Sequence, residues 1–253
     1  MELPKIGTRK LYFLLQDSLE RHHIKIGRDA LFDLLYTNAM LIRKRKKRVF
    51  KTNAGYAVRT FPNLIKKLTV NVSNMVWVSD ITYVRALTGF VYLFLITDAY
   101  SKKIVGYCLS KNLMAINAIR ALKMALRIEK PSFGLIHHSD RGIQYGSKDY
   151  VNLLKENNIG LSMTKGGSPQ ENAVAERVNG ILKNEILSKL TTDNIQEIRK
   201  EIKRAIYIYN EKRPHLSCNM LTPSQAHKTI DTLQPLWKNY KKRKKYHIIV
   251  DNN

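Results

Sequence analysis

Three apolar, strand-like runs separated by two short breaks constrain the fold more than any other feature of this sequence. The runs are rich in β-branched and aromatic residues and span Val76–Val84, Phe90–Thr97 and Ile104–Leu109. The breaks at Leu87–Gly89 and Asp98–Ser101 are too short for a helical crossover, so the three strands form an antiparallel meander. The middle run is almost continuously apolar, which is typical of a strand at the centre of a sheet.

Helical and strand-like patterns alternate after the meander. They predict a helix over Met114–Arg127, a strand over Leu135–His138, a helix from a Ser147 cap to Asn157, a strand over Ile159–Met163 and a helix carrying Glu176. This order predicts an α/β fold in which a mixed five-stranded sheet is flanked by helices. We expect a further helix from an Asp193 cap to about Tyr209, and a short one after Thr222-Pro223-Ser224.

The N-terminal part is helical in pattern. Apolar residues recur at helical spacing over Leu11–Leu19 and Ala30–Leu35, with a polar break at His22–Gly27 between them. Two short helices with such a connection resemble a helix-turn-helix DNA-binding unit, and an ordinary packed helical hairpin explains the pattern as well. The expected organisation is a helical segment over 1–42, a linker over 43–70, a core over 71–190 and C-terminal helices with a basic tail over 191–253.

The charge of the chain points to a polyanionic partner. The formal net charge is +24, and such an excess repels itself unless nucleic acid neutralises it. Residues 71–190 carry 15 basic and 9 acidic groups, whereas residues 1–70 carry 16 and 5. No long apolar span or signal-like segment supports a membrane protein. A basic protein without a polyanionic partner is the alternative.

Two clusters of cations flank the core and are candidate DNA contacts. The linker cluster consists of Arg43, Lys44, Arg45, Lys46, Lys47 and Arg48, and the tail cluster includes Lys241, Lys242 and Arg243. Aromatic residues interleave the tail cluster, as in proteins that combine backbone contact with base stacking. A solvated linker and a solvated tail explain these runs too.

Three acids occupy positions that suit a metal site. Asp80 lies in the first strand, Asp140 ends the fourth, and Glu176 lies on the helix after the Gly166–Pro169 loop. Taken singly, each acid is an ordinary strand, turn or helix residue. Together they favour a site for Mg²⁺, which prefers hard oxygen ligands, and a pair of such ions suits phosphodiester chemistry.

The helix of Glu176 presents a polar face. Asn172, Asn179, Gly180 and Lys183 share the face of Glu176 at helical offsets, and we expect this face to be open to substrate. Asn172 and Lys183 are therefore candidate DNA contacts.

Several other polar residues have ordinary interpretations. Asp98 is interpreted as a turn residue rather than a fourth ligand. His138 either orients the substrate or Asp140, or packs in the core. Cys108 and Cys218 lack the spacing of a zinc site and indicate a reducing, cytosolic setting.

These motifs together resemble the integrase-core (D-D-E) transposases, of the second-open-reading-frame type found in the IS-three group of bacterial insertion sequences. The motifs are Trp77-x-x-Asp80-Ile81-Thr82-Tyr83, His138-Ser139-Asp140-Arg141-Gly142-x-Gln144-Tyr145, Ser168-Pro169-x-x-Asn172-Ala173-x-x-Glu176, Leu182-Lys183-x-Glu185, Tyr209-Asn210-x-x-Arg213-Pro214-His215 and Thr222-Pro223. Asp140 and Glu176 are separated by 35 residues, the spacing that marks this subgroup.

The resemblance implies a ribonuclease-H-like core in which Asp80, Asp140 and Glu176 are catalytic and hold two Mg²⁺ ions, with Mn²⁺ as a substitute. It implies nicking at transposon ends and transfer of the freed 3′-hydroxyl into target DNA, by a bacterial cytoplasmic protein that forms a homo-oligomer on DNA. It also implies that Lys183 contacts DNA near the site.

The resemblance further implies a fusion or pairing with an upstream-frame DNA-binding protein, of which this chain is the downstream product. A non-catalytic DNA-binding regulator from the same element is the alternative function, and a different nuclease on the same fold is a third.

Overall fold

The computed structural model describes residues 3, 5–42, 59–131, 134–165, 169–187, 190–229 and 233. The cation clusters predicted at Arg43–Arg48 and Lys241–Arg243 lie outside these residues, as does the Gly166–Ser168 part of the loop before Glu176.

The order of elements matches the sequence-based expectation. The strands are β1 (Val76–Arg85), β2 (Phe90–Asp98), β3 (Ile104–Ser110), β4 (Ile136–Ser139) and β5 (Gly160–Met163). The α-helices are α1 (Thr8–Arg21), α2 (Arg28–Thr37), α3 (Ala115–Glu129), α4 (Lys148–Glu156), α5 (Ala173–Ile181), α6 (Ile195–Tyr207) and α7 (Pro223–Lys228). Short 3₁₀ or π turns are η1 (Pro169–Asn172), η2 (Leu182–Ile186), η3 (Ile208–Lys212) and η4 (Leu216–Cys218).

The five strands form one mixed sheet in the order β3-β2-β1-β4-β5. The predicted antiparallel meander is confirmed, because β2 pairs antiparallel with both β1 and β3. The strands β4 and β5 join the other edge of β1 in parallel. This arrangement puts β1 at the centre of the sheet, where its residues have neighbours on both sides.

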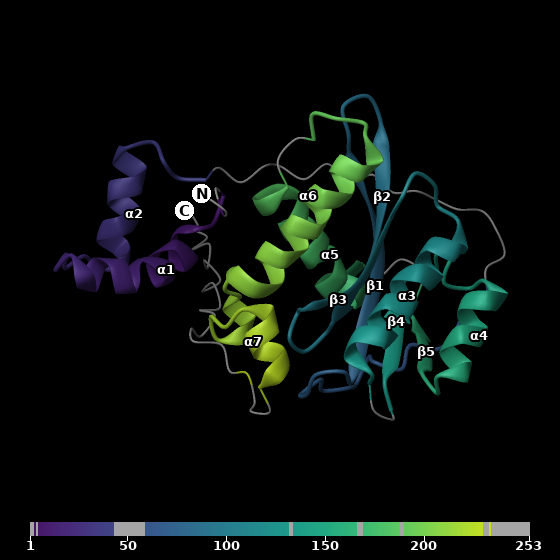
Figure 1. The fold of residues 1–253 in the computed structure, drawn as a ribbon. Coiled ribbons are helices and arrows are strands. Elements are labelled where there is room, and N and C mark those ends of the chain that lie inside the picture. The colour runs from purple at the N-terminus through teal and green to yellow at the C-terminus, as the bar shows by residue number, and fades with distance from the viewer. Residues whose placement is uncertain are drawn as a thin grey trace, which may run out of the picture.

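Helices cover both faces of the sheet (Figure 1). Alternate residues of β2 serve the two faces, since Leu93 and Leu95 pack with α5 and α6 whereas Phe94 and Ile96 pack with α3 and α4. Nearly every side chain of β2 is buried as a result, which explains the continuous apolar pattern of its sequence.

The C-terminal helix α7 is tied to the sheet by a buried polar network. The His227 ring lies 2.9 Å from Ser101 Oγ through Nδ1 and 2.8 Å from Glu129 Oε2 through Nε2. Burial lowers the pKa of His227, but hydrogen bonds and charges of Asp98 and Glu129 outweigh burial and raise it. Ser101 is fully buried, so this serine–histidine–acid arrangement is structural and no substrate reaches it.

Asp98 is a turn residue, as the sequence predicted. Its carboxylate accepts hydrogen bonds from the backbone N–H and hydroxyl of Ser101, both at 2.7 Å, and from the Asn74 N–H. These bonds close the turn between β2 and β3.

The two predicted N-terminal helices are present as α1 and α2. The segment before α1 joins the main core, because Leu3 and Ile6 are buried with residues of β2 and α6. Tyr12 of α1 donates a hydrogen bond to the Ile26 carbonyl and fixes the turn that leads into α2. No helix in the described part of the chain is both long and apolar enough to span a membrane.

Two predicted helix caps differ in detail. The side chain that caps α6 belongs to Asn194, which accepts from the Gln196 N–H, and not to Asp193. Asp193 instead accepts hydrogen bonds from Thr88 in the β1–β2 turn, so its carboxylate makes a tertiary contact and does not cap the helix. Ser147 does occupy the cap position of α4, but its hydroxyl donates to the Gln144 carbonyl.

We expect Gly106→Ala to destabilise the fold by about 1 to 3 kcal/mol, as overpacked cores do. A Cβ atom at Gly106 would lie 2.4 Å from the Ala121 carbonyl oxygen and 2.8 Å from Ala125 Cβ, where β3 meets α3. Urea unfolding measures the change. Gly89→Ala is the matched control, since a Cβ there meets no atom within 4 Å, and equal effects of the two substitutions would contradict the account.

Candidate active site

The parallel pairing of β1 with β4 places two of the predicted acids side by side. Ser79 and Ser139 are register partners, and Asp80 and Asp140 each follow them directly. Neighbouring strands lie about 4.8 Å apart, so the two carboxyl groups start from adjacent backbone positions. Asp80 is within β1 and Asp140 comes directly after β4, both as the sequence predicted.

Helix α5 brings the third acid to the same place. Asn172, at the start of α5, donates a hydrogen bond to the Ser79 carbonyl at 3.0 Å. Asn179 donates one to Asp80 Oδ2 at 2.6 Å. Glu176 lies between these two anchors and one helical turn before Asn179, so it faces the same end of β1.

Asp80 lies close enough to the other two acids for their charges to affect it. Burial raises the pKa of Asp80 to about 7, with the negative charge of Asp140 as the next cause and that of Glu176 a smaller one. Hydrogen bonds from Asn179 and the Ile81 N–H act in the opposite direction. Burial also raises the pKa of Asp140, against a hydrogen bond from the Gly142 N–H. The cluster therefore carries negative charge that nearby groups of the protein do not fully offset.

A buried polar network on the other face of the sheet supports the strands that carry these acids. Nε2 of His137 lies 2.6 Å from Ser79 Oγ and 2.8 Å from Tyr150 OH, which links β1, β4 and α4. Burial lowers the pKa of His137 to about 3, so the ring is neutral at physiological pH. His138 pairs with Ser162 of β5 at 2.8 Å, which assigns it to packing rather than to orienting Asp140.

The donor set suits a divalent cation. Three carboxylates supply hard oxygen ligands, and a cation would offset both the burial of the Asp80 charge and its repulsion by Asp140, which together raise the Asp80 pKa. Among the described residues, no three His, Cys, Asp or Glu side chains converge closely enough to hold one ion as they stand. Asp80 Oδ2 is turned toward Asn179 and Asp140 Oδ1 toward the Gly142 N–H at 3.0 Å, so these side chains would rotate to share an ion.

The expectation that the whole polar face of α5 is open to substrate is wrong for two of its residues. Asn172 and Asn179 are buried, because α5 packs closely on β1 and their amides bond to it. Asn172 is thus a packing residue rather than a DNA contact. The Asn179–Asp80 hydrogen bond was not expected from the sequence, although the offset of three from Glu176 could have indicated it.

Lys183 lies beside the acids on the π-helical turn η2, which follows α5 directly. Its Nζ atom lies 3.4 Å from the Tyr83 carbonyl oxygen and 4.6 Å from the centre of the Tyr83 ring. Burial lowers the Lys183 pKa, and the charge of Asp80 acts in the opposite direction, so the two groups are close enough to interact.

The Tyr-Asn-x-x-Arg-Pro-His segment has a structural role. The Asn210 side chain accepts from the Ile104 N–H and donates to the Ile104 carbonyl, and so pairs with β3 as a neighbouring strand would. Arg213 is buried and pairs with Glu185 at 2.8 Å. The segment therefore fastens the C-terminal helices to the sheet and to η2.

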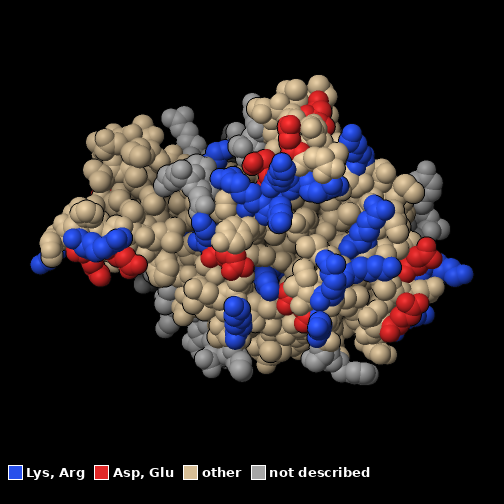
Figure 2. Space-filling model, viewed as in Figure 1, with Lys and Arg blue, Asp and Glu red and all other residues tan. Residues whose placement is uncertain are grey.

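Basic side chains outnumber acidic ones on the face drawn in Figure 2, where Lys and Arg gather over α6. The cations of this helix are Arg199, Lys200, Lys203 and Arg204. Such a surface favours a polyanionic partner.

Comparisons with known proteins agree with the fold and show the family of the chain. Two family models, both described as "Integrase core domain", match residues 71–169 and 157–223. The chain is 36% identical over 222 residues to the insertion element IS600 uncharacterized 31 kDa protein of Shigella sonnei, with 86% of this chain and 79% of the relative covered. It is 30% identical to the transposase for insertion sequence element IS629 of Shigella sonnei, with 88% and 73% covered.

One similar solved structure is a cryoEM structure of a simian T-cell lymphotropic virus intasome in complex with PP2A regulatory subunit B56 gamma. Its matching chain has a TM-score of 0.54 and 19% sequence identity, with 92% of this chain and 78% of that chain covered. The likeness at this identity shows a shared fold, which agrees with the ribonuclease-H-like sheet that the sequence predicted.

We expect Asp80→Asn to stabilise the protein at pH 8 in a chelating buffer, and to do so less at pH 5. The pKa of Asp80 is 3.8 ordinarily and about 7 in the folded protein, so the folded form binds a proton more readily between these values. The stability that this proton gives is present below pH about 4 and is lost as the pH rises through about 7.

Thermal unfolding of both proteins across this pH range measures the effect. A difference in melting temperature that is the same at pH 5 and pH 8 would contradict the pKa assignment. Asp149→Asn, on the exposed start of α4, is the control for removal of one carboxylate outside the cluster, and the change at Asp80 is measured against it.

Proposed function

The chain belongs to the integrase-core family of insertion-sequence transposases, and we propose that it nicks the DNA ends of its element and joins the freed 3′-hydroxyls to target DNA. The observation that carries the proposal is the β1–β4 register, which sets Asp80 beside Asp140 under the helix that holds Glu176. A paired-acid site within a chain of net charge +24 suits a phosphodiester substrate.

The three carboxylates are proposed as the ligands of Mg²⁺, with Mn²⁺ as a substitute. A bound pair of such ions supplies activation of the attacking oxygen, stabilisation of the leaving oxygen and neutralisation of the phosphate. Asp80 on β1 and Asp140 after β4 would hold the ions from the sheet, and Glu176 would hold them from α5. Asn179 holds the Asp80 carboxylate against rotation when no cation is present.

Lys183 is proposed to contact the phosphate backbone near the active site. Its ammonium group interacts with the charge of Asp80 and donates a hydrogen bond to the Tyr83 carbonyl of β1. A cation there attracts DNA and limits how the strand can lie across the acids. The cation clusters at Arg43–Arg48 and Lys241–Arg243 are proposed as further backbone contacts.

We also propose that the protein acts in the bacterial cytoplasm as a homo-oligomer on DNA, since joining two ends needs two sites. Pairing with an upstream-frame DNA-binding protein belongs to the same proposal. A non-catalytic regulatory role is the alternative, and the relatives named as transposases do not favour it.

We expect Asp80→Asn, Asp140→Asn and Glu176→Gln each to lower nicking by more than about a hundredfold, since loss of mere supporting partners of metal ligands already costs about 10- to 100-fold. Labelled DNA carrying the element's end, incubated with Mg²⁺, measures nicking and joining. Binding of the same DNA should persist, because these substitutions replace acids with neutral amides and leave every Lys and Arg that could contact DNA in place.

The matched control is Asp149→Asn, which changes an acid on the helix that covers the opposite face of the sheet. Undiminished nicking by Glu176→Gln would show that the ligand assignment is wrong. Absence of nicking by the unmodified chain, with binding intact, would favour the regulatory alternative.

A further inference from the structure

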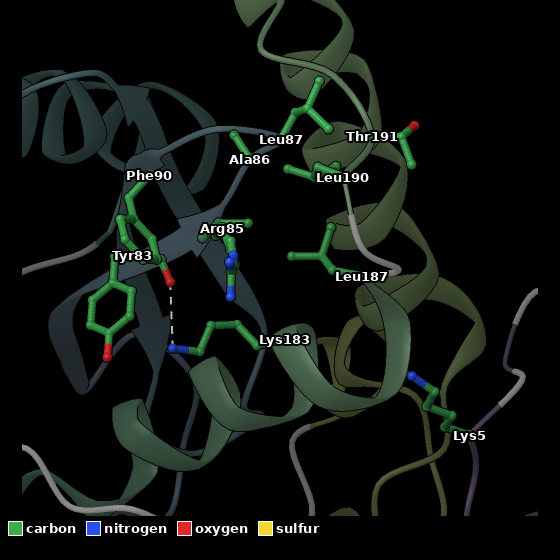
Figure 3. Close-up of a pocket in the computed structure, with 11 residues that line it drawn as sticks. Lys5, Tyr83, Arg85, Ala86, Leu87, Phe90, Lys183, Leu187, Leu190 and Thr191 are labelled. Carbon is green, nitrogen blue, oxygen red and sulfur yellow. Dashed lines mark hydrogen bonds between the residues drawn. The ribbon is translucent and has the colours of Figure 1, made fainter.

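A groove beside the active site is lined by basic and aromatic residues, most of which have no role in the proposed metal chemistry. It has a volume of about 590 Å³ and lies between the β1–β2 hairpin and the segment that follows η2 (Figure 3). Three cations line it, namely Lys5, Arg85 and Lys183. No Asp or Glu is among the described residues that line it, so the groove favours an anion.

The groove also has an exposed aromatic edge. Tyr83 and Phe90 lie on neighbouring strands with ring centres 5.4 Å apart in an edge-to-face arrangement. Their exposed fractions are 52% and 55%, and that of Leu87 beside them is 60%. Large apolar side chains gathered at a surface mark a binding site more often than isolated ones do.

A cation already contacts an aromatic ring at this edge of the groove. Nζ of Lys183 lies over the Tyr83 ring, and the Arg85 side chain extends into the groove near it (Figure 3). Leu187 and Leu190 form the opposite, apolar wall. An anionic group bound by the cations would thus lie next to surfaces that suit a flat, apolar ring.

The distance to the acids connects the groove to the reaction. Tyr83 is three residues after Asp80 on β1, which corresponds to about 10 Å along the strand, and this odd offset turns its side chain to the other face of the sheet. Lys183 follows the helix on the acid face and still reaches the Tyr83 ring, so the groove continues from the acids around the edge of β1. Successive nucleotides of one DNA strand rise by about 3.4 Å, so the groove lies roughly three nucleotides from the acids. A base in a stacked duplex has no free face to offer to Tyr83, whereas an unpaired base does.

We propose that this groove binds one unpaired nucleotide about three positions from the cleavage point on the DNA strand, with its phosphate at Lys183 and Arg85 and its base against Tyr83 and Phe90. The proposal rests on the proposed function, because it assumes that the acids act on DNA. It goes beyond that function in requiring the end of the duplex to open near the active site.

The test compares binding of two probes in a chelating buffer, where no cleavage occurs. One probe is a blunt duplex, and the other is the same duplex with a short unpaired flap that contains 2-aminopurine, whose fluorescence falls when the base stacks. We expect tighter binding of the flap probe and a loss of its fluorescence on binding. Tyr83→Ala and Phe90→Ala should each weaken the preference by about tenfold, as loss of one stacked base does.

Three further variants separate the subsite from general effects. Tyr83→Phe should keep the preference, because the ring is retained. Arg85→Gln should weaken flap binding and reduce its salt dependence by about one ion, as expected for one lost phosphate contact. Tyr207→Ala should change nothing, although Tyr207 is likewise 55% exposed and has a lysine, Lys212, 5.7 Å from its ring centre.

The outcomes distinguish this proposal from the proposed function. Equal binding of both probes by the wild type, or an unchanged preference in Tyr83→Ala and Phe90→Ala, overturns the subsite while nicking still tests the transposase. Failure to bind either probe overturns both. Thermal unfolding of each variant identifies any loss caused by misfolding, and Tyr83→Phe keeps the test decisive if Tyr83→Ala does not fold.

Discussion

The parallel pairing of β1 with β4 is the constraint on which the rest of the structure depends. Its register sets Asp80, on the central strand, beside Asp140 at the end of β4, so that their negative charges repel one another. The meander supplies the other edge of β1, and α5 closes the site from one face of the sheet. A shift of one residue in this register would turn one acid to the opposite face and disperse the site.

The charges of the molecule are arranged around that pairing. Acids that repel one another are concentrated at one point of a strongly basic chain, and Lys183 stands at the border between them and the cationic groove. The structure offsets part of this repulsion with hydrogen bonds from the Asn179 side chain to Asp80 and from the Gly142 N–H to Asp140. A bound divalent cation would relieve the repulsion among the acids, whereas a DNA backbone would neutralise the basic surface around them.

Local patterns in the sequence predict the elements well, but they do not predict which side chains meet. The strands and most helices follow from alternation and helical spacing, and the three acids could be placed on them directly. Burial of Asn172 and Asn179 could not, because it depends on how closely α5 packs on β1. Asp193 was predicted as a cap because local patterns carry no information about Thr88, which is 105 residues away in the sequence. Thr88 donates a hydrogen bond to the Asp193 carboxylate, which therefore does not cap the helix. Similarly, nothing local marks Asn210 as a partner of β3.

The central claim is that Asp80, Asp140 and Glu176 jointly hold divalent cations. Anomalous diffraction from crystals grown with Mn²⁺ tests it most directly, because the signal locates the ions without assuming any activity. The account predicts a peak within about 2.0 to 2.2 Å of oxygens from both Asp80 and Asp140, with Glu176 near that peak or a second one. Ions bound elsewhere, with the Asn179–Asp80 hydrogen bond intact and no density between the two aspartates, would contradict it.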